Sequence, residues 1–400
     1  MRLTGVLLLI AALCAACGAD RPPDGAGLAV SRDTLDGVER ITTAGEVETW
    51  TLHERLRLGS AGGSDEPESD EFAFVSSVAL GPDGRVYVAD LRRSRISVFD
   101  TLGVLQRVMG REGQGPGEFV DLFSIAWLDD RLLALDVGNA RVGVFSSEGA
   151  WVDQRPASGS LTASPATTRL YPVGPAEVYQ WGYETRDGIA EPVWWPHGPA
   201  GRGAAVSRPA PTADASFPDK VVCTMGRGFS WFDHPFAEQA LVHPTRGGGT
   251  LVASTDTYRI VELDAAGDTL LVLVRDVPRP ALSDEEWQPV RDRFAAWLED
   301  KDPSRCRPED LPRPIHKPAI RSLLVDTTGR TWVERSLPVG TVWEVFDADG
   351  VLVGAVPGLE HDRQWTVPWL SRTTAVWVSR DALDVPYVHV ARIEAPGGPG

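Results

Sequence analysis

One short pattern recurs along the chain and constrains the fold more than any other feature of the sequence. The residues of Ser77–Val88, SVALGPDGRVYV, match those of Ser322–Val333, SLLVDTTGRTWV. In both segments an apolar strand reaches a turn that ends in Gly-Arg, and a second strand follows. Another pattern, RISVFDTLG at Arg95–Gly103, recurs at Arg141–Gly149 and Arg259–Gly267, with a turn that is typical of a hairpin. Each repeat therefore predicts four antiparallel strands, labelled a to d, which form one blade of a β-propeller.

Six repeats can be counted from their second strands. These strands are expected at residues 86–89, 132–135, 178–181, 251–254, 331–334 and 375–379. The sixth repeat ends without a fourth strand, whereas the chain before the first repeat contains one: Arg57–Phe72 parallels Arg107–Phe119, the end of a fourth strand and its exit loop. We therefore expect Trp50–Leu58 to pair with the last C-terminal strand. This pairing would close the ring and leave no exposed sheet edge.

Three segments carry a resemblance to a known family: Gly84–Asp90, Arg95–Asp100 and Gly110–Phe119. In these segments the sequence resembles the NHL-like six-bladed β-propellers of bacterial envelope lipoproteins. The resemblance covers most of residues 46–395 and is clearest in the first two repeats. It implies an all-β, six-bladed propeller, but a propeller fold does not by itself define an activity.

An export signal is expected at the start of the chain. After Met1 and Arg2 an apolar run extends to Leu13, which is too short to cross a bilayer as a permanent helix. The next residues, CAACG, resemble a bacterial lipobox. Residues 1–17 are therefore expected to be a lipoprotein signal that places lipid on Cys17. The alternative is ordinary secretory cleavage before Cys17, which would leave this residue as a free thiol.

The segment that follows, residues 18–45, begins GADRPPDG and is expected to be a flexible tether between the membrane and the propeller. Gly18 does not supply the aspartate that holds some lipoproteins at the inner membrane, and this favours the outer membrane. The protein is thus expected in the bacterial cell envelope, with the membrane as a partner through its N-terminal lipid.

A long insertion, residues 276–318, separates the fourth and fifth repeats. From Ser283 onward it combines a good helix N-cap, an acidic first turn and an apolar stripe at helical spacing. This helix is expected at the rim of the ring, as a lid or docking element or as packed decoration. Cys223 and Cys306 are the only cysteines beyond the signal and Cys17. Because exported proteins mature in oxidising compartments, we expect a disulfide between them, with two free thiols as the alternative.

The charge balance argues against a nucleic-acid partner. The formal net charge is −17, and phosphate contacts need clustered Lys and Arg. The densest basic cluster is formed by Arg92, Arg93 and Arg95; together with Arg111 it is expected on the face that bears the b–c turns and the d–a connections. These four arginines are candidate contacts for an unknown protein, glycan or small ligand. The alternative is an ordinary solvated surface.

The sequence shows no compact catalytic or metal-binding motif. Gly110–Glu118 is rich in glycine but lacks the Gly-Lys-Ser/Thr ending of a phosphate-binding loop. Some six-bladed propeller hydrolases hold calcium partly through asparagines, and this chain has only Asn139; a site of carboxylates alone, from Asp83, Asp90 or Asp136, is the alternative. The seven histidines are scattered and lack the spacing of a compact zinc site.

These observations favour a lipid-anchored, non-catalytic binding or interaction module at the cell envelope. No cofactor, metal or catalytic residue is assigned. The alternative is a secreted propeller hydrolase or lyase with a metal site in the central channel.

Overall fold

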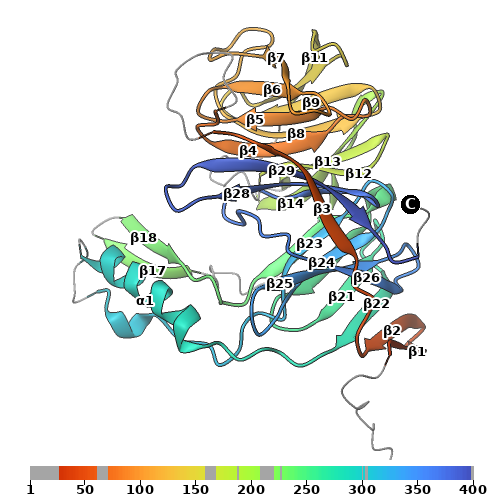
Figure 1. Ribbon diagram of the computed structural model, residues 1–400, viewed down its shortest axis with the longest axis vertical. Coiled ribbons are helices and arrows are strands. Elements are labelled where there is room, and N and C mark those ends of the chain that lie inside the picture. Colours follow the sequence, from red (N-terminus) through yellow and green to blue (C-terminus); the bar gives the residue numbers. More distant parts are fainter. Residues whose placement is uncertain are drawn as a thin grey trace, which may run out of the picture.

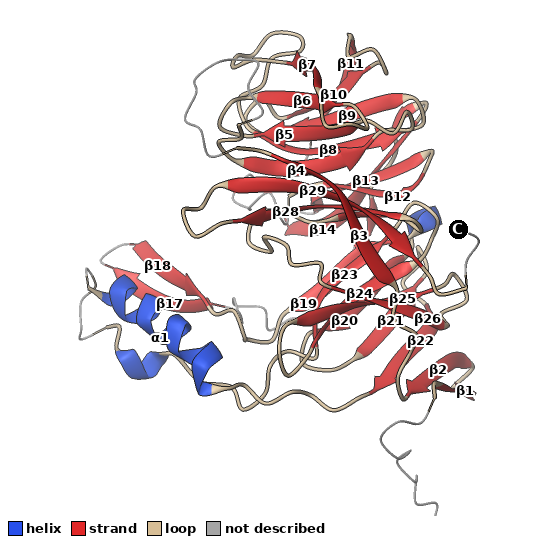
Figure 2. Ribbon diagram, in the orientation of Figure 1, coloured by secondary structure: helices blue, strands red, loops and turns tan. Residues whose placement is uncertain are grey.

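The computed structural model of the protein describes residues 27–60, 71–157, 168–186, 189–207, 220–225, 228–299, 301 and 305–397. Their strands form seven sheets, and the six that have four to six strands are arranged as the blades of one propeller (Figure 1). Figure 2 shows that this part of the chain is built almost entirely of strands and loops. The all-β, six-bladed propeller expected from the repeats is confirmed.

The blades follow the order of the sequence, each with its innermost strand first. Blades 1 to 3 contain β4 (Val75–Leu80), β5 (Val86–Asp90), β6 (Arg95–Phe99), β7 (Leu105–Met109), β8 (Leu122–Leu128), β9 (Arg131–Asp136), β10 (Arg141–Phe145), β11 (Trp151–Pro156), β12 (Leu170–Gly174), β13 (Glu177–Arg186), β14 (Ile189–Gly198), β15 (Gly201–Arg202) and β16 (Val206–Ser207). Blades 4 to 6 contain β19 (Ala240–Pro244), the 3-10 turn η1 (Arg246–Gly248), β20 (Thr250–Ser254), β21 (Arg259–Leu263), β22 (Thr269–Asp276), β23 (Ile320–Val325), β24 (Thr331–Ser336), β25 (Thr341–Phe346), β26 (Leu352–Pro357), β27 (Trp369–Leu370), β28 (Thr374–Arg380) and β29 (Pro386–Glu394). All six second strands lie where the repeats predict them.

The N-terminal strand β3 (Thr51–Leu58) closes the ring, as the sequence predicts. It pairs antiparallel with β29, so that Leu58 lies opposite Val388 and Thr51 lies opposite Glu394. Blade 6 therefore takes its inner three strands from the C-terminal end of the chain and its outer strand from the N-terminal end. Figure 1 shows β3 in orange-red beside the blue strands of blade 6.

The structure corrects the tether expected over residues 18–45 for its described part, residues 27–45, whereas residues 1–26, with the expected signal and Cys17, lie outside the described residues. The described part forms a hairpin of two strands, β1 (Ala29–Leu35) and β2 (Val38–Ala44). The turn residues Asp36 and Gly37 have positive φ angles of 53° and 83°, which match a two-residue hairpin turn. β2 pairs in parallel with β22 at the edge of blade 4, and its Ile41 is 1% exposed. Burial of this apolar side chain against the blade explains why the segment is ordered.

The core lies between neighbouring blades, where the side chains of adjacent sheets interdigitate. Trp332, Trp343 and Trp377, which lie in strands of blades 5 and 6, are buried as expected of blade core. All three pack in one cluster with Trp50, the residue that precedes β3. The N-terminal segment is thus part of the core of blades 5 and 6 as well as their edge.

A small unit outside the ring is formed by the two insertions that flank blade 4. It contains β17 (Lys220–Met225), β18 (Gly228–Asp233), α1 (Asp284–Leu298) and the 3-10 turn η2 (Pro308–Asp310). Figure 1 shows this unit projecting from one side of the propeller. Within the described ranges, no helix is long and apolar enough to span a membrane.

Candidate binding site

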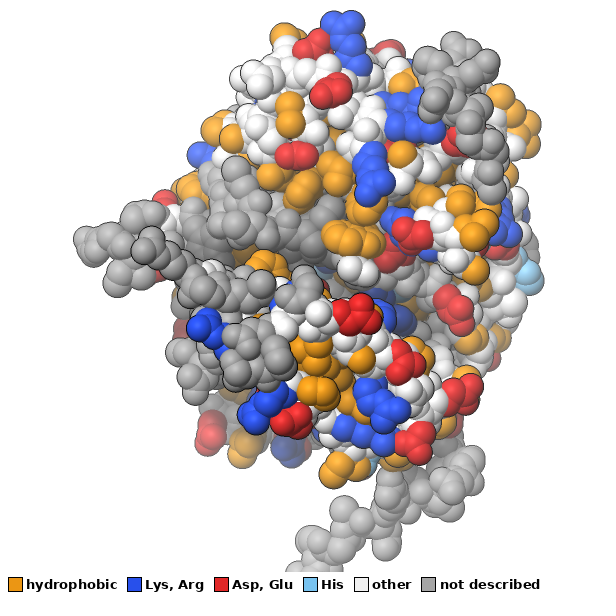
Figure 3. Space-filling view, turned by 90° about the vertical axis from the view of Figure 1, so that its left-hand side faces the viewer, with side chains coloured by type: hydrophobic (Ala, Val, Ile, Leu, Met, Phe, Trp, Pro, Cys, Tyr) orange, Lys and Arg blue, Asp and Glu red, His pale blue; other side chains and the backbone are white. Residues whose placement is uncertain are grey.

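The b–c turns and the d–a connections lie on one face of the ring, which we call the loop face. The projecting unit emerges on the same side, because both insertions are d–a connections. Figure 3, which views this side, shows basic and acidic side chains interspersed with hydrophobic ones. The capacity of this face to bind a partner depends on which of its charged side chains already form hydrogen bonds or ion pairs within the protein.

Two of the four candidate arginines hold the connection that enters blade 1. Arg93 and Arg95 both donate to the backbone carbonyl of Glu71, with nitrogen–oxygen distances of 2.9 and 3.3 Å. Arg95 is buried, and this burial, reinforced by the charge of Arg93, lowers the pKa of its guanidinium. These contacts give both side chains a role in holding the connection.

Arg92 and Arg111 are accessible on the loop face. Arg92 is exposed, and its guanidinium lies 5.9 Å from the ring centre of Phe74. The side chain of Arg111 is 81% exposed and pairs with Glu118 at a distance of 2.7 Å. An exposed ion pair of this kind contributes little to stability, so Arg111 can exchange it for a partner at small cost.

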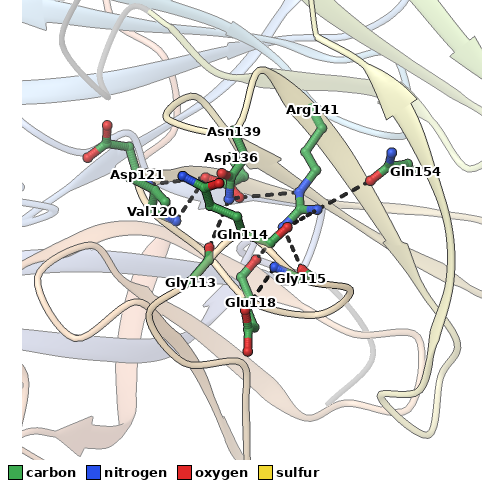
Figure 4. Close-up of polar contacts among 10 residues, drawn as sticks. All are labelled: Gly113, Gln114, Gly115, Glu118, Val120, Asp121, Asp136, Asn139, Arg141 and Gln154. Atoms are coloured by element: carbon green, nitrogen blue, oxygen red, sulfur yellow. Dashed lines mark hydrogen bonds and ion pairs between the residues drawn. The ribbon is translucent and has the colours of Figure 1, made fainter.

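The glycine-rich connection Gly110–Glu118 is held by side chains of blade 2 (Figure 4). Arg141 donates to three of its backbone carbonyls, at 3.1, 2.8 and 2.7 Å: those of Gln114, Gly115 and Glu118. Asn139 donates to a fourth carbonyl, that of Gly113, at 3.0 Å. Because the loop turns carbonyl oxygens toward a protein cation, its geometry favours the expected blade-linking turn over a phosphate-binding loop.

Asp90 and Asp136 fix the ends of these connections in blades 1 and 2. Each carboxylate accepts two backbone N–H groups from the connection that enters its blade: those of Ala73 and Phe74 for Asp90, and those of Val120 and Asp121 for Asp136. Asp83 instead pairs with Arg85 in the a–b turn, on the opposite face. Across the described part of the chain, no three His, Cys, Asp or Glu side chains are grouped so that they could hold a metal ion.

A buried ion pair connects blade 5 to the connection that follows it. Glu334 in β24 is 0% exposed, accepts a hydrogen bond from Nε of Arg363 at 2.8 Å and lies 3.4 Å from Nε2 of His361. Burial alone would raise the pKa of Glu334, but the hydrogen bonds from Arg363 and His361 outweigh it and lower the pKa. The carboxylate therefore stays ionised and is a poor proton acceptor, which makes it unsuited to general base catalysis.

The projecting unit is held together by the expected disulfide. Cys223 in β17 and Cys306 after α1 are bonded, with their Cα atoms 5.7 Å apart. The helix begins as predicted: Ser283 is its N-cap, and its hydroxyl accepts the N–H of Glu286 at 3.2 Å. The apolar stripe of the helix packs with β17 in a separate small core: Val221, Leu282, Trp287, Val290, Phe294 and Leu311.

A cavity of about 80 Å³ lies at the centre of the ring, partly open to solvent. Inner strands of all six blades, or the residues just before them, contribute to its lining. His243 of blade 4 donates from Nδ1 to the carbonyl of Pro244 at 2.8 Å. Burial, together with the nearby charge of Arg169, lowers the pKa of His243 to about 3, so the ring is neutral at physiological pH.

Arg169 and the Glu334 pair are the charged groups that sequence reasoning missed. Arg169 precedes the first strand of blade 3, whose repeat matches the others only weakly. An alignment of the first strands alone could have found it, because Arg169 occupies the position that Ser77 has in blade 1 and Ser124 has in blade 2. The Glu334 pair joins residues that are 27 and 29 positions apart, and no local pattern marks such a contact.

Comparison with known proteins agrees with the fold. A family model described as a 6-bladed β-propeller matches residues 69–150. These residues form blade 1 and most of blade 2 of the propeller. A search of curated proteins gives no significant match.

Three solved structures resemble the propeller over most of its length. A member of the duf4221 family from Bacteroides vulgatus is 9% identical, with 88% of this chain and 100% of that chain covered and a TM-score of 0.43. A Bacteroides fragilis protein described as exported is 10% identical, with coverage of 87% and 100% and a TM-score of 0.40. Virginiamycin B lyase from Staphylococcus aureus is 8% identical, with coverage of 86% and 99% and a TM-score of 0.42. At these values the likenesses carry no argument about function.

Proposed function

We propose that this protein is a non-catalytic binding module of the bacterial cell envelope, held at the outer membrane by lipid on Cys17. Its partner, a protein or a glycan of the envelope, binds on the loop face. The observation that carries the proposal is that some arginines of this face hold the loops while others are exposed. Arg93, Arg95 and Arg141 fix the loops, whereas Arg92 and Arg111 remain accessible.

An ordered surface is well suited to binding. Loops that are already fixed lose little conformational entropy when a partner binds, so more of the contact energy contributes to affinity. The projecting unit adds a second ordered surface on the same side, closed by the Cys223–Cys306 disulfide. Both features support a recognition role.

Two observations support the location. The CAACG sequence at Cys14–Gly18 resembles a lipobox. The disulfide is of the kind that persists in oxidising compartments and is rare in the cytosol.

The alternative, a hydrolase or lyase with a metal site in the central channel, predicts a bound metal ion. Elemental analysis of the purified full-length protein separates the two functions. We expect no stoichiometric calcium, magnesium or zinc. One equivalent of any of these metals per chain would contradict the proposal.

The binding face can be tested in intact cells of the source bacterium. A photo-activated cross-linking residue is placed in the full-length protein at position 92 or position 111. We expect discrete adducts from both positions, because both side chains are accessible on the loop face. The control position is Leu102, which is 80% exposed in the c–d turn of blade 1 on the opposite face. Equal adduct yields from Leu102, or none from positions 92 and 111, would overturn the proposal.

A further inference from the structure

The central cavity contains an arginine at a position that serine occupies in the two preceding blades. Ser77 of blade 1 accepts a hydrogen bond from the N–H of Ile125 in blade 2 at 3.1 Å. Ser124, the residue before Ile125, accepts one from the N–H of Leu170 in blade 3, also at 3.1 Å. The residue before Leu170 is Arg169. The series of serine hydroxyl groups that link neighbouring inner strands thus ends at Arg169. An arginine is not needed for this link between blades, so its presence requires another explanation.

Arg169 has no anionic partner within the residues that the structure describes. Its guanidinium lies 4.5 Å from the ring centre of Tyr171, and its Nε is buried without a hydrogen-bond partner among these residues. Asp326, the one acidic residue in the described lining of the cavity, is engaged elsewhere. Its carboxylate accepts hydrogen bonds from its own hairpin and, at 2.9 Å, from the indole N–H of Trp332. A buried guanidinium nitrogen without an acceptor is costly, which favours a ligand that supplies one.

The remaining walls of the cavity are mixed. They include the aliphatic side chains of Val78, Ile125, Leu170, Leu324, Val367 and Leu370 and also Ser76, Ser77, Ser124 and Thr327. Among the described residues that line the cavity, Arg169 is the only Lys or Arg, and His243 beside it is neutral. An occupant therefore meets one positive charge, together with aliphatic side chains against which a short hydrocarbon tail can pack.

Size and geometry narrow the class of ligand. The cavity of about 80 Å³ has room for roughly five to eight water-sized groups, at about 10–15 Å³ for each. A guanidinium offers parallel N–H donors that match the two oxygens of a carboxylate. Inorganic phosphate is strongly hydrated and carries more negative charge than the one guanidinium in the described lining can balance, whereas a carboxylate carries a single charge.

We propose that the central cavity binds a small aliphatic carboxylate, whose head group pairs with Arg169 and whose tail lies against the aliphatic side chains of the walls. This site is distinct from the loop-face partner site proposed above. Either proposal can therefore fail while the other holds.

The test uses butyrate, a four-carbon carboxylate, and butyramide, its uncharged counterpart of similar shape. Isothermal titration calorimetry is performed on the purified full-length protein at constant ionic strength. We expect butyrate to bind at one site per chain and butyramide not to bind. Arg169→Gln should weaken butyrate binding by at least about tenfold, because the charged pair is lost.

Matched variants separate the role of Arg169 from a general loss of charge. Arg131→Gln removes an arginine outside the cavity, where it pairs with Asp130 at 3.5 Å, and should leave butyrate affinity unchanged. Arg169→Lys keeps the charge without the parallel donors and should bind with intermediate affinity. Circular dichroism and thermal melting establish that each variant is folded.

Four results would overturn the proposal. They are the absence of butyrate binding to the wild-type protein, equal binding of butyramide, undiminished butyrate affinity in folded Arg169→Gln, and binding of inorganic phosphate as tight as that of butyrate. If Arg169→Gln fails to fold, the comparisons of butyrate with butyramide and of wild type with Arg169→Lys decide the question.

Discussion

Arg141 satisfies three carbonyl oxygens of one loop, and in blade 1 Arg95 donates to the Glu71 carbonyl of the loop before that blade. Each arginine follows, by five positions, an aspartate that accepts N–H groups from the same loop: Asp136 for Arg141 and Asp90 for Arg95. At the scale of single residues, an Asp and an Arg at this spacing therefore form a clamp for the connection between blades. The motif RISVFD, which carries the family resemblance, begins with the arginine of this clamp.

Arg141→Ala should destabilise the protein by about 2 kcal/mol or more, because backbone carbonyls are left without donors in a half-buried loop. The free energy of unfolding in urea measures the loss. Arg111→Ala, in the same loop but exposed, serves as the control and should change stability by less than about 0.5 kcal/mol. Equal effects of the two substitutions would show that the clamp contributes no more than a surface charge.

His243 should make the protein sensitive to acid. Its pKa is about 3 in the folded state against an ordinary value of 6.5, because of burial and the nearby Arg169. Between these values the unfolded chain binds a proton that the folded chain does not, so stability is full above the ordinary value and falls as the pH is lowered. The loss is about 1.4 kcal/mol per pH unit for one such group.

The measurement compares wild type and His243→Gln by urea unfolding between about pH 6 and pH 4, a range that lies inside this window. The variant should lose less stability over the range than the wild-type protein, whatever its stability at neutral pH. Parallel pH profiles would mean that His243 is protonated in the folded state.

At the scale of elements, the N-terminal segment contacts three blades. β2 extends blade 4, the N–H of Trp50 donates to the carbonyl of Ala355 in blade 5 at 2.7 Å, and β3 completes blade 6. The two parts of the segment differ in the sheet edge with which they pair. β1 and β2 add strands to a blade that already has four, whereas β3 fills a vacant edge.

Truncations should separate these contributions. Compared with a soluble form that begins at residue 27, removal through residue 45 should cost about 2 kcal/mol, the scale of burying one large apolar side chain such as Ile41. Removal through Leu58 should expose the edge of β29 and abolish cooperative unfolding. Thermal melting of the three forms measures the difference. Similar midpoints for the two shorter forms would contradict ring closure by β3.

At the scale of the whole molecule, the sequence predicted the architecture because the blade repeat is local. Alternating apolar residues and hairpin turns lie within a few positions of each other, and even the closing strand could be inferred from a missing fourth strand. Features that depend on distant neighbours leave no such local pattern in the sequence. The hairpin at residues 29–44 is ordered by blade 4, and the Glu334–Arg363 pair depends on how blades 5 and 6 meet.

The candidate site was predicted only in part, for the same physical reason. The sequence located Arg92, Arg93, Arg95 and Arg111 on one face, but it could not distinguish those that donate to backbone carbonyls from those that stay accessible. That distinction depends on where the chain from Glu71 returns in space. The disulfide was predictable because an oxidising compartment and two remaining cysteines leave few pairings.

The lipid on Cys17 remains a prediction for the whole molecule. Cys17→Ser should leave the signal uncleaved or release a soluble protein, because the acyl chains that provide stable anchoring are absent. Mass spectrometry of the protein and its distribution between membrane and soluble fractions measure the change. A variant with the same processed mass and the same membrane fraction as wild type would show that Cys17 is not the anchor point.

Closure by β3 also sets the order of events as the chain is made. The hydrogen bond between Glu54 and His389, at 3.0 Å, joins residues 335 positions apart, so one partner is synthesised near the beginning and the other near the end. Pairing over such a separation is slow, and until it forms both strand edges are open to unwanted association. An exported chain of this design cannot finish folding while its last strand is still in transit. Under the export that we propose, β3 and β29 meet only outside the export channel, where folding ends and the ring becomes resistant to aggregation.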